Sequence, residues 1–533
     1  QIARAHPPTP SGLPAQPAVP PTMVPAADGL ATDSTQGACE PQQKKVRGLA
    51  AVAVGFITDT EGNFDYWCRC VELSRVVCFG PDGTLQFVRQ DEQDIFVFGG
   101  DVFDKGPGDI RIASALVDLK TRYPDRVILL VGNRDLNKLR FAAELGEDEI
   151  DVPQPVPTYP RAPPQVSYRA FLDKTAAANG TTAERENVRA NRLRWILDHT
   201  MTAQGVFEYR RQEMAILRAA ACSESGPQPE APSDEEVAQH FLDSVLKDDG
   251  ICWRYLHLGQ VAALVGATLF VHGGVPPESI GWVPGLDMRY RAPQDGDVCG
   301  GTTLPVGHSL QQWVDAMNDV HQRGLQDFRA QPTWREDRTR GGESLLAVTS
   351  SPACFGRSVV VESLLQAGTP LPLDPRVEEY LANGGVSRMV CGHKPCGDSP
   401  FVLGGRRVEV VHCDTTYSDH GAPDQRGQVV AAVELEGDVL RNRTHIRGVL
   451  RDGSLYDFAL PELGDRGSIG ERGANEGQSD GDAFIGHQTR DGWWIKARLE
   501  DGEYHVARSK PGDRNVSYKR VSPDSLLEAP SSL

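Results

Sequence analysis

Short apolar runs, each bounded by Gly, Asp or Asn, recur along the chain. Five of them have the length of a strand: 49–57 (LAAVAVGFI), 94–98 (DIFVF), 126–131 (RVILLV), 267–271 (ATLFV) and 387–391 (SRMVC). Continuous apolar runs of this length are typical of strands that are buried on both faces of a sheet. The pattern therefore predicts strands in the interior of a layered fold.

Helical spacing appears between these runs. Residues 109–121 carry apolar side chains at helical intervals behind Asp109, a plausible cap, and residues 135–145 begin a second helix behind Asp135. Strand, loop and helix alternate, which favours an α/β fold. Residues 400–450 instead form short strands with turn signals, so we expect an antiparallel second half of the sheet.

Composition divides the chain into four parts. We expect a disordered Pro/Ala-rich arm at 1–46, an α/β domain at 47–462, a flexible linker at 463–483 and a small β-rich segment at 484–533. Within the α/β domain, a proline-rich stretch introduces a mostly helical insertion at 151–250. The predicted architecture is thus one large domain with an insertion and a C-terminal β appendage.

Charge and cysteine content narrow the function classes. The 533 residues carry a net charge of −18, which argues against a nucleic-acid surface or an anionic-membrane surface. No apolar run reaches the roughly 18–20 residues that span a bilayer. The eleven cysteines lack paired CxxC spacing, and we expect reduced thiols and a cytoplasmic location. The chain begins at Gln1, so a targeting segment could have preceded it.

A polar ligand-type residue follows each of the five apolar runs. These residues are Asp59, Asp101, Asn133, His272 and His393. Open α/β sheets place their ligands at the carboxyl ends of strands. Carboxylate, amide oxygen and imidazole are ligands for Mn, Fe or Zn, and a shared carboxylate can hold two ions about 3.5–4 Å apart. The pattern predicts a metal centre that activates water for attack on phosphorus, without a protein nucleophile.

These stretches resemble the signature of the calcineurin-like metallophosphoesterases, which runs D-x-H, G-D-x-x-D-R-G, G-N-H-E, an isolated His, and G-H. The matching stretches are DTEG (59–62), GDVFDKG (100–106), GNRD (132–135), VHGG (271–274) and CGHKP (391–395). The resemblance covers about 47–135 and 265–450. It implies a four-layer α/β/β/α sandwich, to which the helical insertion and the C-terminal β appendage are added.

The resemblance also implies a role for each matching residue. Asp59 would bind the first of two divalent ions, and Asp101 would bridge both. The second ion would be bound by Asn133, His272 and His393. Asp104 would orient the site, and Lys105 would hold a phosphate oxygen. Mn is the favoured metal, with Fe, Zn or Mg as alternatives.

Three positions depart from the family pattern. Glu61 replaces the His of D-x-H and could ligate the first ion through oxygen, which favours Mn or Mg over Zn. Arg134 replaces the His of GNHE; it cannot donate a proton at neutral pH but can bind a phosphate oxygen. Asp135 is a shortened partner that could pair with Arg134. Alternatively, Glu61 and Arg134 form structural ion pairs.

Three other features have two interpretations each. His412 could supply a further ligand or an acid, although a packed histidine is the simpler interpretation. Arg210 and Arg211 could reach over the site or lie on a solvated helix face. Trp493 and Trp494 could form a ligand platform or a packed β edge.

The sequence therefore predicts metal-dependent hydrolysis of a phosphate ester or phosphoanhydride. The phosphorylated substrate would be a nucleotide or a phosphoprotein. The His of GNHE, which could protonate the leaving group, is absent here. A substrate whose leaving group is a phosphate is therefore mildly favoured, because a phosphate needs protonation less. The alternative is a binding or scaffold protein that keeps the fold but has impaired catalysis, for which the replacements at Glu61 and Arg134 are the evidence.

Overall fold

The computed structural model describes most of the chain beyond its first segment. The described residues are 53–90, 92–146, 149, 166–222, 229–291, 293–366, 369–415, 429–437, 443–461, 482–489, 491–509 and 516–527. The predicted arm at 1–46, the proline-rich stretch at 151–165 and all but the last two residues of the predicted linker lie outside them.

The first sheet has six strands in the order β17-β16-β15-β1-β4-β5. Their bounds are β17 Leu455–Ala459, β16 Arg443–Val449, β15 Val430–Glu436, β1 Ala53–Ile57, β4 Ile95–Phe98 and β5 Val127–Leu129. Strands β1, β4 and β5 are parallel, whereas β15, β16 and β17 join antiparallel to them and to one another. The first three apolar runs thus form the parallel half of this sheet.

The second sheet has five strands in the order β13-β14-β12-β7-β6. Their bounds are β13 Phe401–Gly404, β14 Glu409–His412, β12 Arg388–Cys391, β7 Thr268–Val271 and β6 Ala262–Val265. The last two apolar runs form β7 and β12, which pair in parallel. Strand β14 pairs antiparallel with β13, as expected for 400–450, but it pairs in parallel with β12 on its other side. The first sheet takes its antiparallel half from the same region of the chain.

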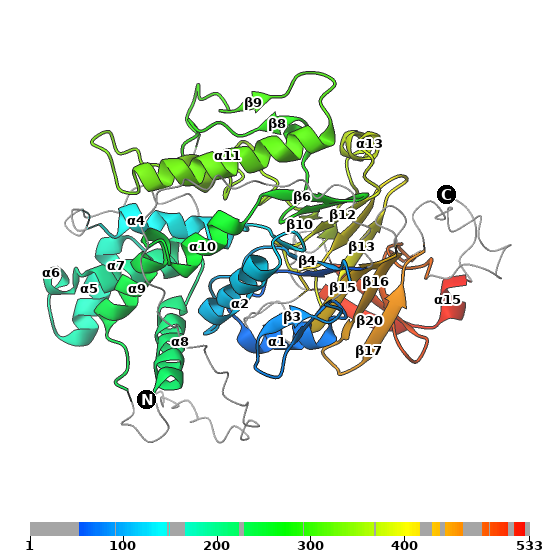
Figure 1. Cartoon of the computed structure of the whole chain (residues 1–533), viewed down its shortest axis with the longest axis horizontal. Coiled ribbons are helices and arrows are strands. Elements are labelled where there is room, and N and C mark those ends of the chain that lie inside the picture. The colour runs from blue at the N-terminus through cyan, green and yellow to red at the C-terminus, as the bar shows by residue number, and fades with distance from the viewer. Residues whose placement is uncertain are drawn as a thin grey trace, which may run out of the picture.

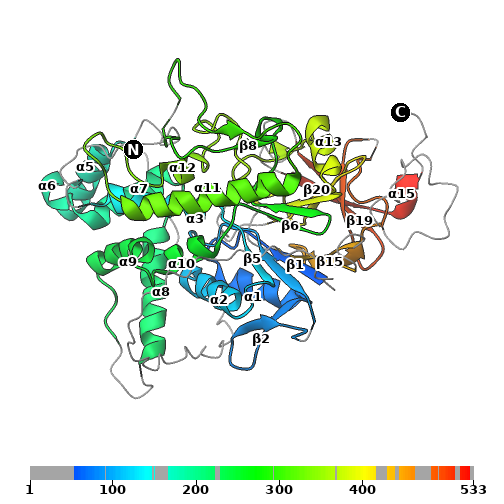
Figure 2. The same cartoon turned by 45° about the horizontal axis from the view of Figure 1, so that its top comes forward.

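Helices cover the outer faces of the two sheets. Helices α1 (Phe64–Leu73) and α2 (Asp109–Arg122) lie on the side of β1 and β5, whereas α11 (Leu310–Ala330) and α13 (Pro375–Asn383) lie on the side of β6 (Figures 1 and 2). Between the sheets, Phe56 of β1 and Phe270 of β7 stack with ring centroids 5.8 Å apart. The chain therefore has the four-layer α/β/β/α sandwich.

The helix expected over 135–145 is broken into three pieces and begins earlier. The pieces are α3 (Asn133–Leu136), the 3-10 turn η1 (Asn137–Leu139) and α4 (Arg140–Glu144). Asp109, expected as a cap, is instead the first residue of α2, and its side chain accepts a hydrogen bond from Arg210. The remaining short elements are β2 (Val77–Phe79), β3 (Leu85–Phe87), η3 (Pro277–Ser279), β8 (Trp282–Val283), β9 (Thr302–Thr303), α12 (Glu343–Ala347), β10 (Leu365–Gln366) and β11 (Thr369–Pro370).

The regular elements described between α4 and β6 are all helices. Its helices are α5 (Tyr168–Asn179), α6 (Ala183–Glu186), α7 (Arg189–Thr200), α8 (Val206–Ala221), α9 (Asp234–Leu246) and α10 (Ile251–Leu258). Ser233 caps α9, and Glu236 completes the capping box. Apolar side chains of α4, α7, α8 and α9 share a cluster that includes Phe141, Trp195 and Phe241.

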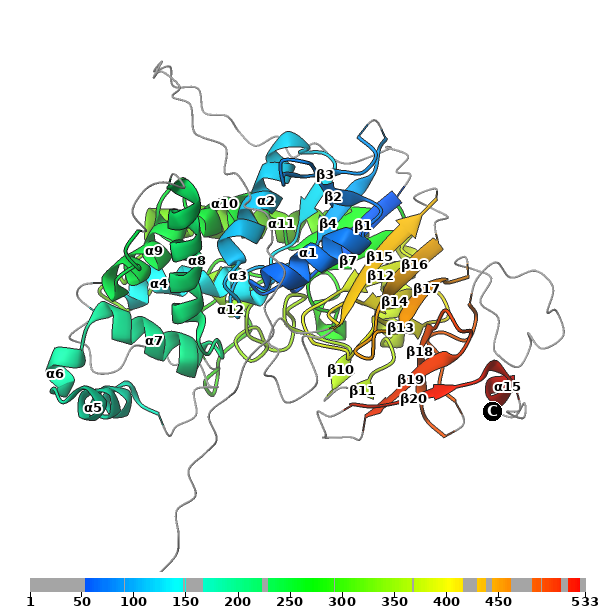
Figure 3. The ribbon, with the colours of Figure 1, turned by 90° about the horizontal axis from the view of Figure 1, so that it is seen from below.

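The C-terminal strands form a third, antiparallel sheet. It contains β18 (Trp494–Arg498), β19 (Tyr504–Ser509) and β20 (Val516–Val521), and the short helix α15 (Pro523–Leu527) follows. This sheet lies beside β13 and β17 (Figure 3). The ring of Trp494 packs edge-on against Phe401 at 5.1 Å, and Lys519 Nζ lies 4.5 Å from the ring of Trp493. These contacts favour the packed β edge over a ligand platform.

Two further features of the described residues are the state of the cysteines and the hydropathy of the helices. The ten cysteines within the described ranges are all free thiols. Among the helices that the structure describes, none is long and apolar enough to cross a membrane.

Candidate metal centre

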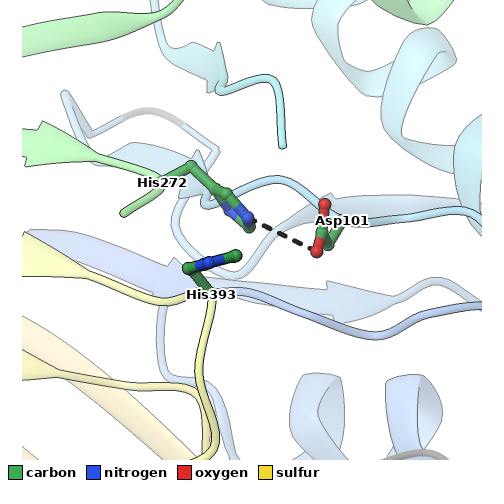
Figure 4. Close-up of side chains that lie close together, drawn as sticks. All are labelled: Asp101, His272 and His393. Carbon is green, nitrogen blue, oxygen red and sulfur yellow. Dashed lines mark ion pairs between the residues drawn. The ribbon is translucent and has the colours of Figure 1, made fainter. Parts of the chain in front are cut away.

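Strand ends from both sheets meet at the centre of the molecule. Asp101 follows β4, His272 follows β7 and His393 follows β12, and these three residues offer ligand atoms that all lie within 4.8 Å of one another. His272 Nε2 lies 3.4 Å from Asp101 Oδ2. Figure 4 shows His272 and Asp101 pointing toward each other, with His393 beside them. Two sheets therefore bring together residues that lie far apart in the sequence.

The loops at these strand ends carry an unusual backbone. Positive φ angles occur at nine described non-glycine residues, and six of those nine are site residues: Asp59, Glu61, Asp101, Asp104, Lys105 and His393. Such conformations cost about 1–3 kcal/mol each and cluster at functional sites. Backbone hydrogen bonds between the loops hold them, with Glu61 N donating to Asp101 O at 3.0 Å and Gly62 N to Val102 O at 2.9 Å.

Two glycines allow the loops to approach the carboxylates closely. A Cβ atom at Gly132 would lie 2.1 Å from Asp101 Oδ1, and one at Gly392 would lie 2.2 Å from Asp59 Oδ2. Any side chain at either position would displace the carboxylate or the loop. Both motifs, GNRD and CGHKP, therefore need a glycine because there is no space for a side chain. At Gly132 the backbone angle does not require glycine, since its φ is −98°.

Asp135 holds the Asp101 loop in place. Its Oδ2 accepts hydrogen bonds from the N–H groups of Asp101 (2.9 Å) and Gly132 (2.8 Å), and its Oδ1 accepts one from Val102 (2.9 Å). Burial and, to a lesser degree, the nearby Asp101 carboxylate raise the pKa of Asp135 to about 7. The carboxylate of Asp135 is thus committed to backbone amides, and the residue positions Asp101.

Glu61 lies between two cations. Its Oε1 is 2.6 Å from Arg134 Nε, and its Oε2 is 2.9 Å from Lys105 Nζ. On the other side of Arg134, Asp104 Oδ2 is 3.3 Å from the guanidinium, and Asp104 Oδ1 forms an ion pair with Lys138, with 2.8 Å between Oδ1 and Nζ. This is the ion-pair arrangement considered as the alternative for Glu61 and Arg134. Asp104 thus contacts both Arg134 and Lys138.

Sequence reasoning missed Lys138. It is 2% exposed and lies four residues after Arg134, on the same face of the chain segment that follows GNRD. That spacing behind a motif arginine was the available signal. The second missed feature is Thr58, whose hydroxyl donates to Asp59 Oδ2 at 2.5 Å.

The residues at this centre fit a divalent metal ion. His272 Nδ1 hydrogen-bonds to Gly99 O at 2.7 Å, which leaves Nε2 directed toward Asp101. His272 Nε2, His393 Nδ1 and Asn133 Oδ1 are buried atoms with no hydrogen-bond partner in the described part of the chain. Buried polar atoms are normally partnered. One carboxylate, one amide oxygen and two imidazoles form a donor set that suits Mn, Fe or Zn.

Electrostatics also favour a cation at this position. Burial, opposed by His272 and supported by Asp101, raises the pKa of Asp59 to about 7. Burial lowers the pKa of His272, but Asp101 and Asp59 outweigh burial and bring it to about 10. Two buried carboxylates thus compete for positive charge, and a divalent ion would supply that charge and displace the proton of His272.

Asp59 lies beside the cluster rather than within it. Its two carboxylate oxygens accept the backbone N–H of His393 at 3.2 and 3.1 Å. His412 is paired across from Cys391 in the sheet, and both of its ring nitrogens lack a hydrogen-bond partner among the described residues. Burial lowers the pKa of His412 to about 3, so its ring is neutral at pH 7.

The two arginines of the helical insertion do not form one solvated face. Arg210 is 3% exposed and donates to Asp109 Oδ2 at 2.8 Å, so the expectation of a solvated face is wrong for it. Arg211 binds Glu208 at 2.8 Å and also pairs with Asp234, near the surface. Both arginines bind carboxylates of α2, α8 or α9.

Comparisons with known proteins give one family match, to part of the chain. Residues 52–199 match the family model for calcineurin-like phosphoesterases. No curated protein matches the chain. Among solved structures, similar chains include a cold-active protein-tyrosine phosphatase of a psychrophilic Shewanella species. Its TM-score is 0.39 at 13% identity, and the match covers 77% of this chain and 81% of that chain.

A protein serine/threonine phosphatase from Saccharomyces cerevisiae is also similar, with a TM-score of 0.28 and 10% identity over 73% of each chain. At such low TM-scores, neither likeness bears on the function of this chain. The family match supports phosphoester hydrolysis as the general class of activity and phosphorylated compounds as the class of substrate. Residues 52–199 are therefore similar to a calcineurin-like phosphoesterase domain.

Proposed function

We propose that this protein hydrolyses a phosphate ester or phosphoanhydride with the help of a bound divalent metal ion. The observation that carries the proposal is the cluster of Asp101, His272 and His393, whose ligand atoms lie within 4.8 Å of one another at the ends of three buried strands. Asn133, with its unpartnered Oδ1, would complete the donor set. A divalent ion bound there would lower the pKa of a water molecule and stabilise charge on the phosphoryl group.

The resemblance to the family implies two ions, Mn being favoured, with Asp101 shared between them. The contacts support the two sets of proposed ligands unequally. One set is well supported: Asp101, His272 and His393 lie in one cluster. Asn133, His272 and His393 each also offer a buried atom that has no hydrogen-bond partner among the described residues. Glu61, proposed for the other ion, has both carboxylate oxygens bound to cations. Asp59 accepts hydrogen bonds from Thr58 and from the backbone of His393.

The substrate would be phosphorylated, either a nucleotide or a phosphoprotein. Lys105 and Arg134 place positive charge beside the centre, where it would attract phosphate oxygens. Arg134 stands at the position where the family motif has a histidine, and a guanidinium cannot give up a proton at neutral pH. A leaving group that needs no proton, such as the phosphate released from an anhydride, therefore suits this site better than an alcohol.

A second candidate function has its own supporting observation. Glu61 engages the two cations that would bind a phosphate group, Lys105 and Arg134. Substrate would have to compete with this carboxylate for both of them. A protein with this arrangement could bind metal and a phosphorylated partner while turning it over slowly, as expected of a scaffold with impaired catalysis.

The ten free cysteines of the described ranges support a reducing compartment such as the cytoplasm.

Hydrolysis by the purified, Mn-loaded protein tests the proposed function. The substrates are an aryl phosphate, a phosphopeptide and a dinucleoside polyphosphate, and the variants are Asp101→Asn and the control Asp118→Asn. Asp118 lies on the exposed side of α2, with a side chain that is 54% exposed. We expect Mn-dependent turnover, fastest on the dinucleoside polyphosphate, that Asp101→Asn abolishes and Asp118→Asn retains. Metal binding without turnover of any substrate would support the scaffold instead.

A further inference from the structure

We propose that the guanidinium of Arg134 takes the place of one of the two metal ions, so that this protein holds a single divalent ion. The ion would be bound on the side of Asp101, His272 and His393, and Arg134 would supply fixed positive charge on the side of Glu61. This inference rests on the proposed metal-dependent function and specifies the number of ions that the site takes.

The position of the guanidinium is the first argument. An ion shared by Glu61 and Asp101 would need an oxygen of each residue at about 2.0–2.2 Å. Arg134 Nε already lies between the same two carboxylates, 2.6 Å from Glu61 Oε1 and 3.8 Å from Asp101 Oδ2. Guanidinium and ion would therefore occupy the same space. The backbone N–H of Arg134 also donates to Asp101 Oδ1 at 2.8 Å, which ties the residue to the carboxylate expected to bridge.

The second argument is that the backbone holds this arrangement in place. Glu61 and Lys105 both have positive φ, and the loops that carry them are interlocked. A Cβ atom at Gly62 would lie 2.4 Å from Asp104 O, and one at Gly106 would lie 2.4 Å from Gly62 O. Such close packing of backbone against backbone places Glu61 opposite Lys105. The contact between their side chains therefore follows from the fold of the two loops.

Charge is the third argument. Arg134 and Lys105 contact Glu61, while Arg134 and Lys138 contact Asp104. The side chains of Glu61 and Asp104 are 5% and 0% exposed. Buried carboxylates need a cationic partner, and both have at least one in the protein itself. A second divalent ion would add charge where three protein cations, Lys105, Arg134 and Lys138, are already gathered.

The number of bound ions tests this inference directly. The full-length protein is saturated with Mn²⁺, freed of excess metal, and analysed by plasma mass spectrometry together with calorimetric titration. Electron paramagnetic resonance of the same sample distinguishes an isolated Mn²⁺ from an exchange-coupled pair. We expect about one ion per chain and the spectrum of an isolated ion. Two ions per chain with a coupled spectrum would overturn the inference and leave the proposed function intact.

Variants add a test in the opposite direction. The double substitution Glu61→His with Arg134→His removes the guanidinium and restores the family residue at both positions. We expect this variant to bind about two ions per chain. Arg323→Ala, which removes an arginine that is 50% exposed on α11, serves as the control and should retain one ion. A double variant that still binds a single ion would overturn the role of Arg134 in excluding the second.

Turnover separates the failure of this inference from the failure of the proposed function. One bound ion without hydrolysis of any substrate would uphold the single-ion centre and refute the hydrolase. Two bound ions with Mn-dependent hydrolysis would refute the single-ion centre and uphold the hydrolase. A wild-type protein that binds no ion would overturn both.

Discussion

Arg134 Nε lies 2.6 Å from Glu61 Oε1, and the two side chains are only 10% and 5% exposed. Removing one partner from a buried ion pair costs about 3–5 kcal/mol, because the remaining charge stays buried. Since each residue here keeps a second partner, we expect Glu61→Gln and Arg134→Gln each to lower the free energy of unfolding by about 3 kcal/mol. A double-mutant cycle from urea unfolding measures the coupling between them.

The double variant should lose clearly less stability than the sum of the two single variants. The exposed pair of Arg169 and Glu184, with side chains 59% and 72% exposed, is the matched control, and its coupling should be much weaker than that of the buried pair. Strictly additive losses at Glu61 and Arg134 would contradict the pairing.

Gly132→Ala tests the close approach of the backbone to the Asp101 carboxylate. The new Cβ would lie 2.1 Å from Asp101 Oδ1 and 2.5 Å from Asp101 N, so the carboxylate must move. Displacing groups that orient a ligand typically lowers metal affinity about 10–100-fold, and we expect a loss in this range by calorimetric titration with Mn²⁺. Gly146→Ala is the control, because its Cβ would meet its nearest atom, Ala143 O, at 3.4 Å. Equal affinity in the two variants would show that Asp101 does not bind the ion.

The buried His321 should make the folded protein less stable in mild acid. Burial lowers its pKa to about 4 in the folded chain, against about 6.5 in the unfolded chain. As the pH falls, the unfolded chain therefore takes up the proton first, and stability that is present above pH 6.5 is lost progressively toward pH 4. From this residue alone we expect a loss of about 2 kcal/mol between pH 7.5 and pH 5.

The comparison that isolates this effect is His321→Gln, measured by urea unfolding at both pH values. Glutamine does not titrate, and its amide can replace the hydrogen bond from His321 Nε2 to Leu256 O, which is 2.9 Å long. The variant should lose about 2 kcal/mol less than the wild type over the same interval. If both proteins lose the same amount, His321 is not the titrating group. His199→Gln, at a partly exposed histidine of α7, controls for the substitution itself.

Lys496→Met tests the attachment of the C-terminal sheet to the loop that carries His393. Lys496 is 1% exposed, and its Nζ donates to Cys396 O at 2.6 Å. Methionine keeps the apolar stem and removes the donor, so we expect the free energy of unfolding to fall by about 1–3 kcal/mol. We also expect weaker Mn²⁺ binding, because Cys396 follows His393 by three residues.

Lys519→Met provides the matched control on the same sheet, where the ammonium is 38% exposed and pairs with Asp491 at 3.0 Å. That change should cost less than about 1 kcal/mol and leave metal affinity unaltered. The prediction fails if both lysines tolerate methionine equally well.

The sequence by itself determined the strands and the residues at their ends. Continuous apolar runs can only be buried, so all five formed strands of the two central sheets, and 109–121 formed most of α2, which ends at Arg122. The polar residue after each run had to lie at a carboxyl end, because strand direction fixes that edge. Asp101, His272 and His393 could therefore be proposed together before their distances were known.

Only the tertiary structure decided what each charged side chain contacts. Glu61 contacts Arg134 because the fold brings together the loops after β1 and β5, two strands that β4 separates in the sheet. The two residues lie more than 70 positions apart, so no local sequence pattern indicates the contact. The same holds for Arg210, which is buried against Asp109 from a different helix, and for Lys496, which reaches Cys396 from another sheet. Hydrophobic periodicity is set by neighbours along the chain, whereas the partner of a buried charge depends on which elements the fold brings together.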